Sequence, residues 1–214
     1  MKLFKSFTAC RSTTTGTENG HEYVDLGLPS GTKWATCNVG ATAPEAYGDC
    51  FAWGETEPKD YYDWNTYKFT TDGCRTFTKY NDTDGKTTLD PEDDAAAVNW
   101  GGRWRMPTDA EWIELEENCT WTWTRLNGVN GCEVKSKTNG NSIFLPEADR
   151  CDFGGVHGIH FFGDSGGIFT RSLLADNPNV ELELFADLGN DEWFGLFGGN
   201  YDRYYGSSVR PVFK

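Results

Sequence analysis

The sequence predicts a loop-rich domain of the α+β or mostly β class, and three observations lead to this expectation. Aromatic residues make up 15% of the 214 residues and are accompanied by 25 glycines, so large core rings must be joined by many tight turns. Several stretches alternate apolar and polar residues, as half-buried strands do. Two further stretches carry helix-start signals, at Pro91 and at Thr108. This mixture is not typical of a helical bundle.

The N-terminal part predicts a leader, a hairpin and a long irregular region. Residues 1–20 are mostly polar and rich in Thr, so a flexible leader is expected. A hairpin follows over residues 23–36, with its turn at 29–31. Residues 51–53 are apolar and are expected to be buried, whereas residues 54–86 are typical of long surface loops.

Two short helices are predicted in the middle of the chain. Residues 89–100 form the first, because Pro91 suits the first helical position and the acids after it lie at the positive end of the helix dipole. Thr108 can cap the second helix, and Glu111, three residues later, completes a capping box. Three tryptophans within thirteen residues carry too much apolar surface to stay wet, so the centre of the fold is expected to contain Trp100, Trp104 and Trp112.

Strands dominate the prediction for the C-terminal half. Strict alternation over residues 120–126 predicts a half-buried strand, with residues 132–137 as its hairpin partner across a turn at 127–131. Residues 149–167 are rich in glycine and are expected to be irregular. Further strands are expected at 142–146, 168–174, 181–188, 193–197 and 208–213, the last of which closes the chain.

Charge and cysteine spacing exclude several classes of function. The net charge of −14 argues against binding to phosphate backbones, so nucleic acid is not expected as a partner. No apolar run is long enough for a direct membrane span. The seven cysteines contain no C-x-x-C pair, which argues against a zinc site. Thiols in a reducing compartment and two or three disulfides outside the cell both fit this pattern.

The N-terminus contains a weak secretion signal. Residues 7–10 resemble a loose bacterial lipobox, but the residues before them are too few for the apolar region of a signal peptide. A flexible leader is therefore the favoured interpretation. The protein would be a lipoprotein if a longer signal preceded Cys10.

Three local patterns could carry metal or catalytic chemistry, and each has a plainer interpretation. The acids at 82–85, with Asp90 and those after it, could bind calcium, but the ligand ladder of a calcium loop is incomplete. The histidines of 157–160 have ligand-like spacing without a third ligand nearby. Ser165 lies in a GDSGG run without the rest of a protease pattern. We therefore expect no metal, no cofactor and no catalytic residue.

The last part of the chain has the composition of a recognition surface. Residues 194–213 are dense in Tyr, Phe, Gly, Ser and Asn, which supply rigid contact area and adaptable polar groups. They contain no Lys, Glu, Gln, Met or Trp, and these are the residues that a codon of the form NNC cannot encode. The rings could also simply fill the core, but their alternation with glycine makes complete burial hard to arrange.

Four motifs together resemble a known bacterial family. YVDLGLPSGTKWATCNVGA, YGDCFAWGET, EDDAAAVNWGGRWRMPT and the terminal SVRPV are similar to the FISUMP major paralogous domain, and to gut-phage and Bacteroidales variable proteins of diversity-generating retroelements. RMPTDAEW is similar to R-L-P-T-E-A-E-W of the formylglycine-generating, sulfatase-modifying family. The resemblance implies a C-type-lectin-like α+β fold over residues 21–214, with two short helices, small twisted antiparallel sheets and long loops. Its variable region would span about 166–213.

The resemblance also implies which residues contact a ligand. Residues 176–179 match the fixed framework of the variable proteins, as does the pattern R-Y-x-G-x-S-V-R-P-V at 203–212, in which the two positions marked x, 205 and 207, are variable. The register near 194–197 stays open, because the chain between Gly189 and Asn200 is longer than the family pattern. Carried over position by position, the variable surface consists of Thr170, Arg171, Phe194, Leu196, Phe197, Asn200, Tyr201, Asp202, Tyr205 and Ser207.

The function implied by the resemblance is binding without catalysis. Formylglycine-generating enzymes use a late cysteine pair, and here no cysteine follows Cys151. The expected partner is a protein or glycan on another cell surface, and the expected location is a phage particle or a bacterial cell surface. The alternative is a fixed carbohydrate- or protein-binding surface domain of the FISUMP type.

Overall fold

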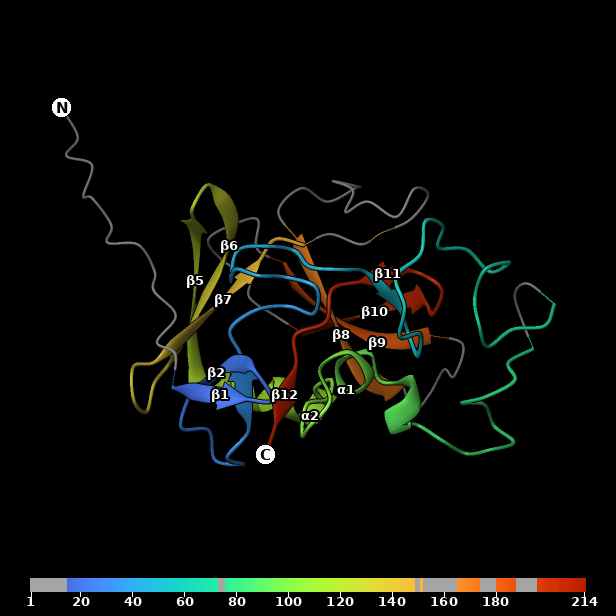
Figure 1. Ribbon diagram of the computed structural model, residues 1–214, viewed down its shortest axis with the longest axis horizontal. Coiled ribbons are helices and arrows are strands. Elements are labelled where there is room, and N and C mark those ends of the chain that lie inside the picture. The colour runs from blue at the N-terminus through green and yellow to red at the C-terminus, as the bar shows by residue number, and fades with distance from the viewer. Residues whose placement is uncertain (1–14, 73–75, 149–150, 152–164, 174–179, 188–195) are drawn as a thin grey trace.

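The α+β class is confirmed: two short α-helices pack with small antiparallel sheets (Figure 1). Among the helices of the described ranges, none has the length and hydropathy needed to cross a membrane. The computed structural model describes residues 15–72, 76–148, 151, 165–173, 180–187 and 196–214.

The first and last strands of the described chain lie in one four-stranded sheet, so the chain closes on itself as predicted. Val212 pairs with Trp34 in this sheet. One expectation was wrong, because Gly16–Glu18 form a strand inside the predicted leader. Gly16 lies opposite Tyr23 in this pairing, and the Tyr23 hydroxyl occupies the space beside it, 2.8 Å from where a Cβ would lie. The strand order is β1 (Gly16–Glu18), β2 (His21–Asp25), β3 (Lys33–Ala35) and β12 (Val212–Phe213).

A second sheet contains the predicted hairpin and lies at one side of the molecule (Figure 1). The turn is shorter than predicted, because Asn127 and Gly128 both adopt positive φ, 48° and 93°. This conformation suits the two-residue loops that match the twist of a hairpin. The strand order is β5 (Cys119–Leu126), β6 (Val129–Ser136) and β7 (Ser142–Pro146).

The first predicted helix is divided into two pieces. A 3₁₀ turn covers Pro91–Asp93, and α1 follows over Ala95–Trp100. Asp94 separates them in an extended conformation, because its carboxylate accepts from the backbone N–H of Ala97 and of Met106, each over 3.0 Å. The acid predicted inside a helix is therefore a helix cap.

The second predicted helix is confirmed with its capping box. Helix α2 spans Asp109–Asn118, and the Thr108 hydroxyl accepts from the Glu111 N–H over 3.2 Å. The Glu111 carboxylate accepts from the Thr108 N–H over 3.1 Å. Trp112 and Leu115 then face the core.

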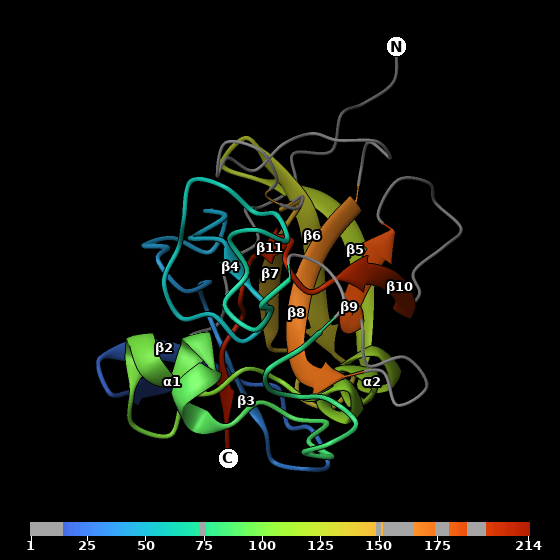
Figure 2. The same ribbon diagram turned by 90° about the vertical axis from the view of Figure 1, so that its right-hand side faces the viewer.

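Two small sheets position the C-terminal segment. Strand β10 pairs with β9, and β9 with β8, side by side in front of the hairpin sheet (Figure 2). Strand β11 pairs with β4. Of the strand predicted at 193–197, residues 193–195 lie outside the described residues, and 196–197 begin β10, which continues beyond the prediction to Asp202. Their bounds are β4 (Phe51–Ala52), β8 (Ser165–Leu173), β9 (Val180–Asp187), β10 (Leu196–Asp202) and β11 (Gly206–Ser207).

The core is largely aromatic, and the tryptophans predicted at its centre are buried. In the described part of the chain, the core consists of two clusters of buried side chains. The second cluster lies around α2 and the hairpin sheet and includes Val24, Leu26, Trp34 and Trp112. The expectation of long loops for 54–86 is confirmed in part. The described residues of this stretch form no named helix or strand, but several of its rings are buried in the first cluster and do not lie at the surface. These are Tyr62, Tyr67, Phe69, Phe77 and Tyr80.

Candidate binding surface

Most of the predicted ligand positions lie in residues 196–207, which comprise β10, β11 and the short connection between these two strands. Strand β10 ends at Asp202 and β11 begins at Gly206, so residues 203–205 join them. The N–H of Tyr205 donates to the Asp202 carbonyl over 3.1 Å, which closes a tight turn. We call Asp202, Tyr204 and Tyr205, each half-buried, the turn surface.

A buried arginine holds this turn from beneath. Arg203 has no exposed surface, and its guanidinium lies 4.2 Å from the ring centroid of Phe77 and 5.2 Å from that of Trp53. It donates to the carbonyl of Tyr80 over 2.7 Å. The Arg203 carbonyl in turn accepts from the N–H of Trp53 over 3.0 Å. Stacking on two rings stabilises a cation that has lost its water.

A second buried arginine fixes the chain after the turn. Arg210 donates to the Asn38 side-chain oxygen over 2.7 Å, and to the carbonyls of Ala35, Thr36 and Phe144 over 2.9 to 3.1 Å. Burial lowers the pKa of Arg210 to about 10, which leaves it charged at neutral pH. Both arginines belong to the stretch 203–212 that was expected to be the fixed framework.

The tyrosines of the turn surface form an aromatic group with a residue from the region 54–86. The rings of Tyr204 and Tyr205 lie 4.3 Å apart between centroids, and Tyr204 meets Trp64 edge to face at 4.9 Å. On their backbone side, Gly206 lies against the ring of Tyr62, where a Cβ would come within 2.7 Å of a ring carbon. Only glycine allows β11 to approach this ring so closely.

The turn surface also carries an acid. Partial burial raises the pKa of the Asp202 carboxyl above its ordinary value. Removing a carboxylate from water without a cation beside it disfavours the charged form. A ligand group that donates a hydrogen bond or carries positive charge would reverse this cost.

Two predicted positions are fully buried and a third is held by internal contacts, and this corrects the prediction of exposed ligand contacts there. Thr170 and Ser207 have no exposed surface. The Thr170 carbonyl accepts from the Trp53 indole N–H over 3.0 Å, and Ser207 pairs with Phe51. Arg171 is turned toward the interior, because it donates to the Leu89 carbonyl and its Nε lies 3.8 Å from the Asp94 carboxylate.

The remaining predicted positions lie on β10 or outside the described residues. Leu196, Phe197, Asn200 and Tyr201 lie opposite Ala186, Phe185, Leu182 and Glu181 in the β9 register, and the structure describes their backbone. Phe194 lies outside the described residues, as do the histidines of 157–160.

Three of the acids considered for calcium, Asp90, Glu92 and Asp93, form an ion-pair network. Lys79 lies 2.7 Å from Asp90 and 2.5 Å from Asp93. Lys68 and Lys86 complete the network at distances of 2.7 Å from Asp93 and 2.5 Å from Asp90. Burial acts to raise the pKa of Asp93, but hydrogen bonds from Lys68, Lys79 and the Tyr80 hydroxyl outweigh it and lower that pKa. Three ammonium groups therefore balance the carboxylates Asp90, Glu92 and Asp93.

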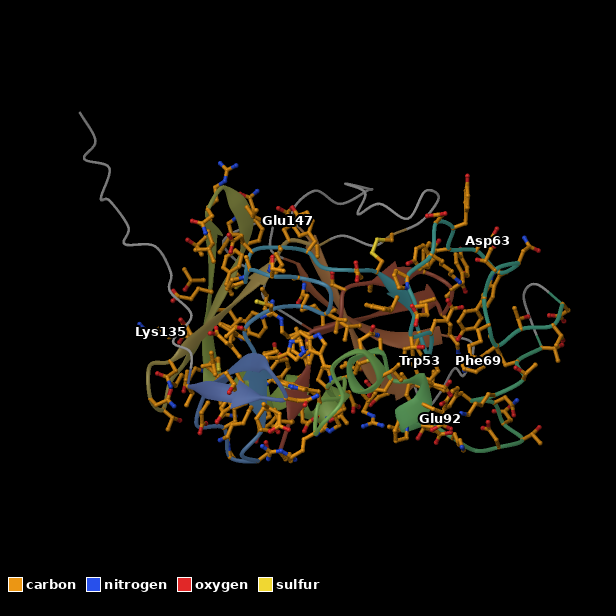
Figure 3. All side chains as sticks on the ribbon, in the orientation of Figure 1. Trp53, Asp63, Phe69, Glu92, Lys135 and Glu147 are labelled. Carbon is orange, nitrogen blue, oxygen red and sulfur yellow. A yellow bond between two sulfur atoms is a disulfide. The ribbon has the colours of Figure 1, made fainter. Side chains whose placement is uncertain are left out.

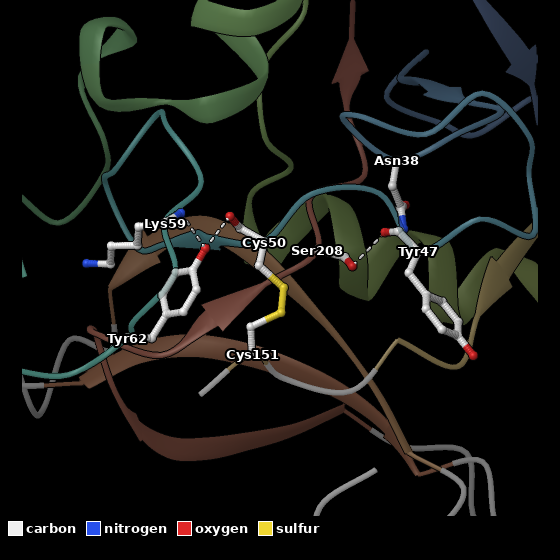
Figure 4. The surroundings of a disulfide bond; sticks show 7 residues. All are labelled: Asn38, Tyr47, Cys50, Lys59, Tyr62, Cys151 and Ser208. Carbon is white, nitrogen blue, oxygen red and sulfur yellow. Dashed lines mark hydrogen bonds between the residues drawn. A yellow bond between two sulfur atoms is a disulfide. The ribbon is translucent and has the colours of Figure 1, made fainter. Parts of the chain in front are cut away.

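A disulfide connects the residue before β4 to Cys151 (Figure 4). Cys50 is bonded to Cys151, with 6.3 Å between their Cα atoms, and Cys151 also exchanges backbone hydrogen bonds with Gly206 over 2.8 and 3.0 Å. Cysteine spacing did not predict this pair. Cys119 remains a thiol, and burial raises its pKa to about 11 even though Lys137 acts to lower it, so it is protonated and a poor nucleophile at neutral pH.

Sequence reasoning missed one aromatic residue of the turn surface, Tyr204, and two that lie beside it, Tyr62 and Trp64. Tyr62, Trp64 and Tyr204 were not singled out as site residues. The signal was present as the dense run Tyr-Tyr-Asp-Trp at 61–64, but its partner lies about 140 residues later, and one sequence cannot show that contact.

Comparisons with known proteins found no similar protein. No protein-family model matches the chain, and no curated protein or solved structure matches it.

Proposed function

We propose that the chain is a non-enzymatic binding protein with a C-type-lectin-like fold, whose C-terminal surface is diversified by a retroelement. The observation that carries this proposal is a contrast between neighbouring positions. Arg203 and Arg210 are fully buried and hydrogen-bonded at positions that match the fixed framework. Asp202 and Tyr205 match variable positions and keep exposed surface.

This contrast suits a surface that must change without unfolding its support. Substitutions at exposed positions usually change the free energy of unfolding by less than about 0.5 kcal/mol. Loss of a buried hydrogen-bonding group costs roughly 1 to 3 kcal/mol for each partner left unsatisfied. Diversification at Asp202 and Tyr205 would therefore alter recognition, whereas Arg203 and Arg210 would have to stay constant.

The burial data narrow the proposed ligand-contacting set. Thr170 and Ser207 are fully buried and Arg171 is hydrogen-bonded internally, so we leave these three out of the contact surface. The set then consists of the turn positions Asp202 and Tyr205, with Tyr204 beside them, and the β10 positions Leu196, Phe197, Asn200 and Tyr201.

The proposed partner is a protein or a glycan on another cell, met by a protein displayed on a phage particle or a bacterial surface. Tyrosines supply much of the binding energy in such surfaces because they give large contact area at low entropy cost. Display in several copies would raise the overall avidity above that of a single site.

The DNA that flanks the gene tests this proposal. A diversity-generating retroelement requires a reverse-transcriptase gene and a template repeat that matches the 3′ part of this coding sequence, with adenines at the variable codons. Long-read sequencing of the locus should find both. Their absence would contradict diversification and favour the fixed surface domain of the FISUMP type.

A further inference from the structure

A second exposed feature lies beside the turn surface. Residues 57–65 read EPKDYYDWN, and we call them the arm. Tyr61 has 58% of its surface exposed, the largest fraction among the exposed large apolar side chains of the described residues. Glu57 and Asp60 are exposed, and Asp63 is half-exposed near the outer edge of the molecule in Figure 3, farther out than Trp53.

The arm contacts the segment of the turn surface at two points. Trp64 meets Tyr204 at 4.9 Å between ring centroids, and the ring of Tyr62 lies against Gly206. The Tyr62 hydroxyl donates to the Cys50 carbonyl over 2.7 Å and accepts from the Lys59 N–H over 3.1 Å (Figure 4). The arm is therefore held at the same disulfide that supports the turn, and the two surfaces are continuous.

The exposed charge of the arm is negative. Its one basic residue, Lys59, lies 2.8 Å from Glu55 and donates to the Thr66 carbonyl over 3.0 Å, so its ammonium is already used at the base of the arm. Within the described part of the chain, Glu57 and Asp60 make no hydrogen bond or ion pair through their carboxylates. Two exposed carboxylates thus precede the exposed Tyr61 in the chain, Asp60 directly and Glu57 four residues earlier.

We propose that the arm is a fixed docking site for a basic segment of a partner protein. A Lys or Arg side chain can lie over the face of the Tyr61 ring while Glu57 or Asp60 pairs with its charge. This proposal rests on the proposed function and deepens it, because the arm lies outside the variable region. The arm would supply affinity common to all variants, and the turn surface would supply selectivity.

Titration of the ¹⁵N-labelled protein with a basic probe peptide tests the proposal. The probe is the capped octapeptide (Arg-Gly)₄, with (Ser-Gly)₄ as the neutral control. Amide shifts should concentrate at residues 57–66 and 204–206 and should weaken as salt is added. Tyr61→Ala should raise the Kd about two- to fivefold, and Glu57→Gln with Asp60→Asn should raise it further. Because all three side chains are exposed, these variants should fold normally.

The matched control is Glu117→Gln on helix α2, an exposed carboxylate away from the arm. It should change the Kd less than twofold. Shifts spread evenly over the acidic surface, or a Kd insensitive to Tyr61→Ala, would overturn the proposal, because the attraction would then come from the net charge alone.

This experiment separates the arm from diversification. Probe binding at the arm with no template repeat at the locus would retain the docking site and reject the retroelement. A template repeat without binding at the arm would retain the retroelement and reject the docking site.

Discussion

Arg210 illustrates how one residue can hold several parts of the chain together. Its guanidinium donates to the Asn38 side chain and to the carbonyls of Ala35, Thr36 and Phe144, which come from segments far apart in sequence. The sequence indicated that this position is fixed, through the resemblance of SVRPV. It could not show the acceptors, because they depend on how three segments meet.

We expect Arg210→Met to lower the free energy of unfolding by more than about 3 kcal/mol, since several buried acceptors would lose their donor. Chemical denaturation measures this change. Arg125→Met, at an exposed arginine of β5, is the control and should cost less than about 1 kcal/mol. Similar losses in the two variants would show that the buried hydrogen bonds of Arg210 contribute little.

At the scale of an element, the capping box of α2 depends on the ionised form of Glu111. Burial acts to raise the pKa of Glu111, but hydrogen bonds from Arg105 and from the Thr108 backbone outweigh it and lower the pKa from 4.5 to about 2. The carboxylate is therefore stabilised in the folded protein relative to the unfolded chain. Its contribution is present above pH 4.5 and is lost as the pH falls toward 2.

We expect Glu111→Gln to destabilise the protein near neutral pH, and we expect the difference from the parent protein to shrink between pH 4.5 and pH 2. Denaturation curves at several pH values measure this difference. Glu117→Gln serves as the exposed control on the same helix and should show a small difference throughout. A Glu111→Gln effect that stays constant over this range would contradict the assigned ion pair with Arg105.

The disulfide connects two elements that frame the candidate surface. It joins Cys50, the residue before β4, to Cys151, closing a loop with a sequence separation of 101 residues. A cross-link of this length restricts the unfolded chain, and such bonds typically contribute about 2 to 4 kcal/mol. The expectation of thiols or of several disulfides left this pairing open, because cysteine counts do not reveal connectivity.

We therefore predict that Cys50→Ser with Cys151→Ser lowers the free energy of unfolding by about 2 to 4 kcal/mol. Calorimetry and denaturant titration give the change. Cys37→Ser is the matched control, because Cys37 is a half-buried thiol outside the disulfide. If the double variant unfolds like the parent protein, the disulfide is not formed in solution.

For the whole molecule, the sequence predicted local features better than long-range contacts. The capping box of Thr108, strand 142–146 and the closure of the chain near Val212 were predicted correctly, because short patterns determine them. The sequence did not predict that Asp94 caps a helix, that rings of 54–86 lie in the core, or that Thr170 is buried. Each of these depends on contacts between distant segments, such as the bond from the Trp53 indole to the Thr170 carbonyl.

The candidate site shows the same division. The resemblance placed Arg203 and Arg210 in the framework, and both are fully buried and hydrogen-bonded. It also marked Ser207 as variable, although pairing with Phe51 buries it. A position-by-position resemblance carries no information on burial, so one-residue errors between exposed and buried neighbours are expected.

The most direct test of the account is sequencing this gene across many isolates or within one mixed population. We predict changes concentrated in the codons of the β10 positions, Asp202 and Tyr205, at sites that match template adenines. The codons of Arg203 and Arg210 should stay unchanged. Even variation along the chain, or none at all, would contradict the account and leave a surface domain of fixed specificity.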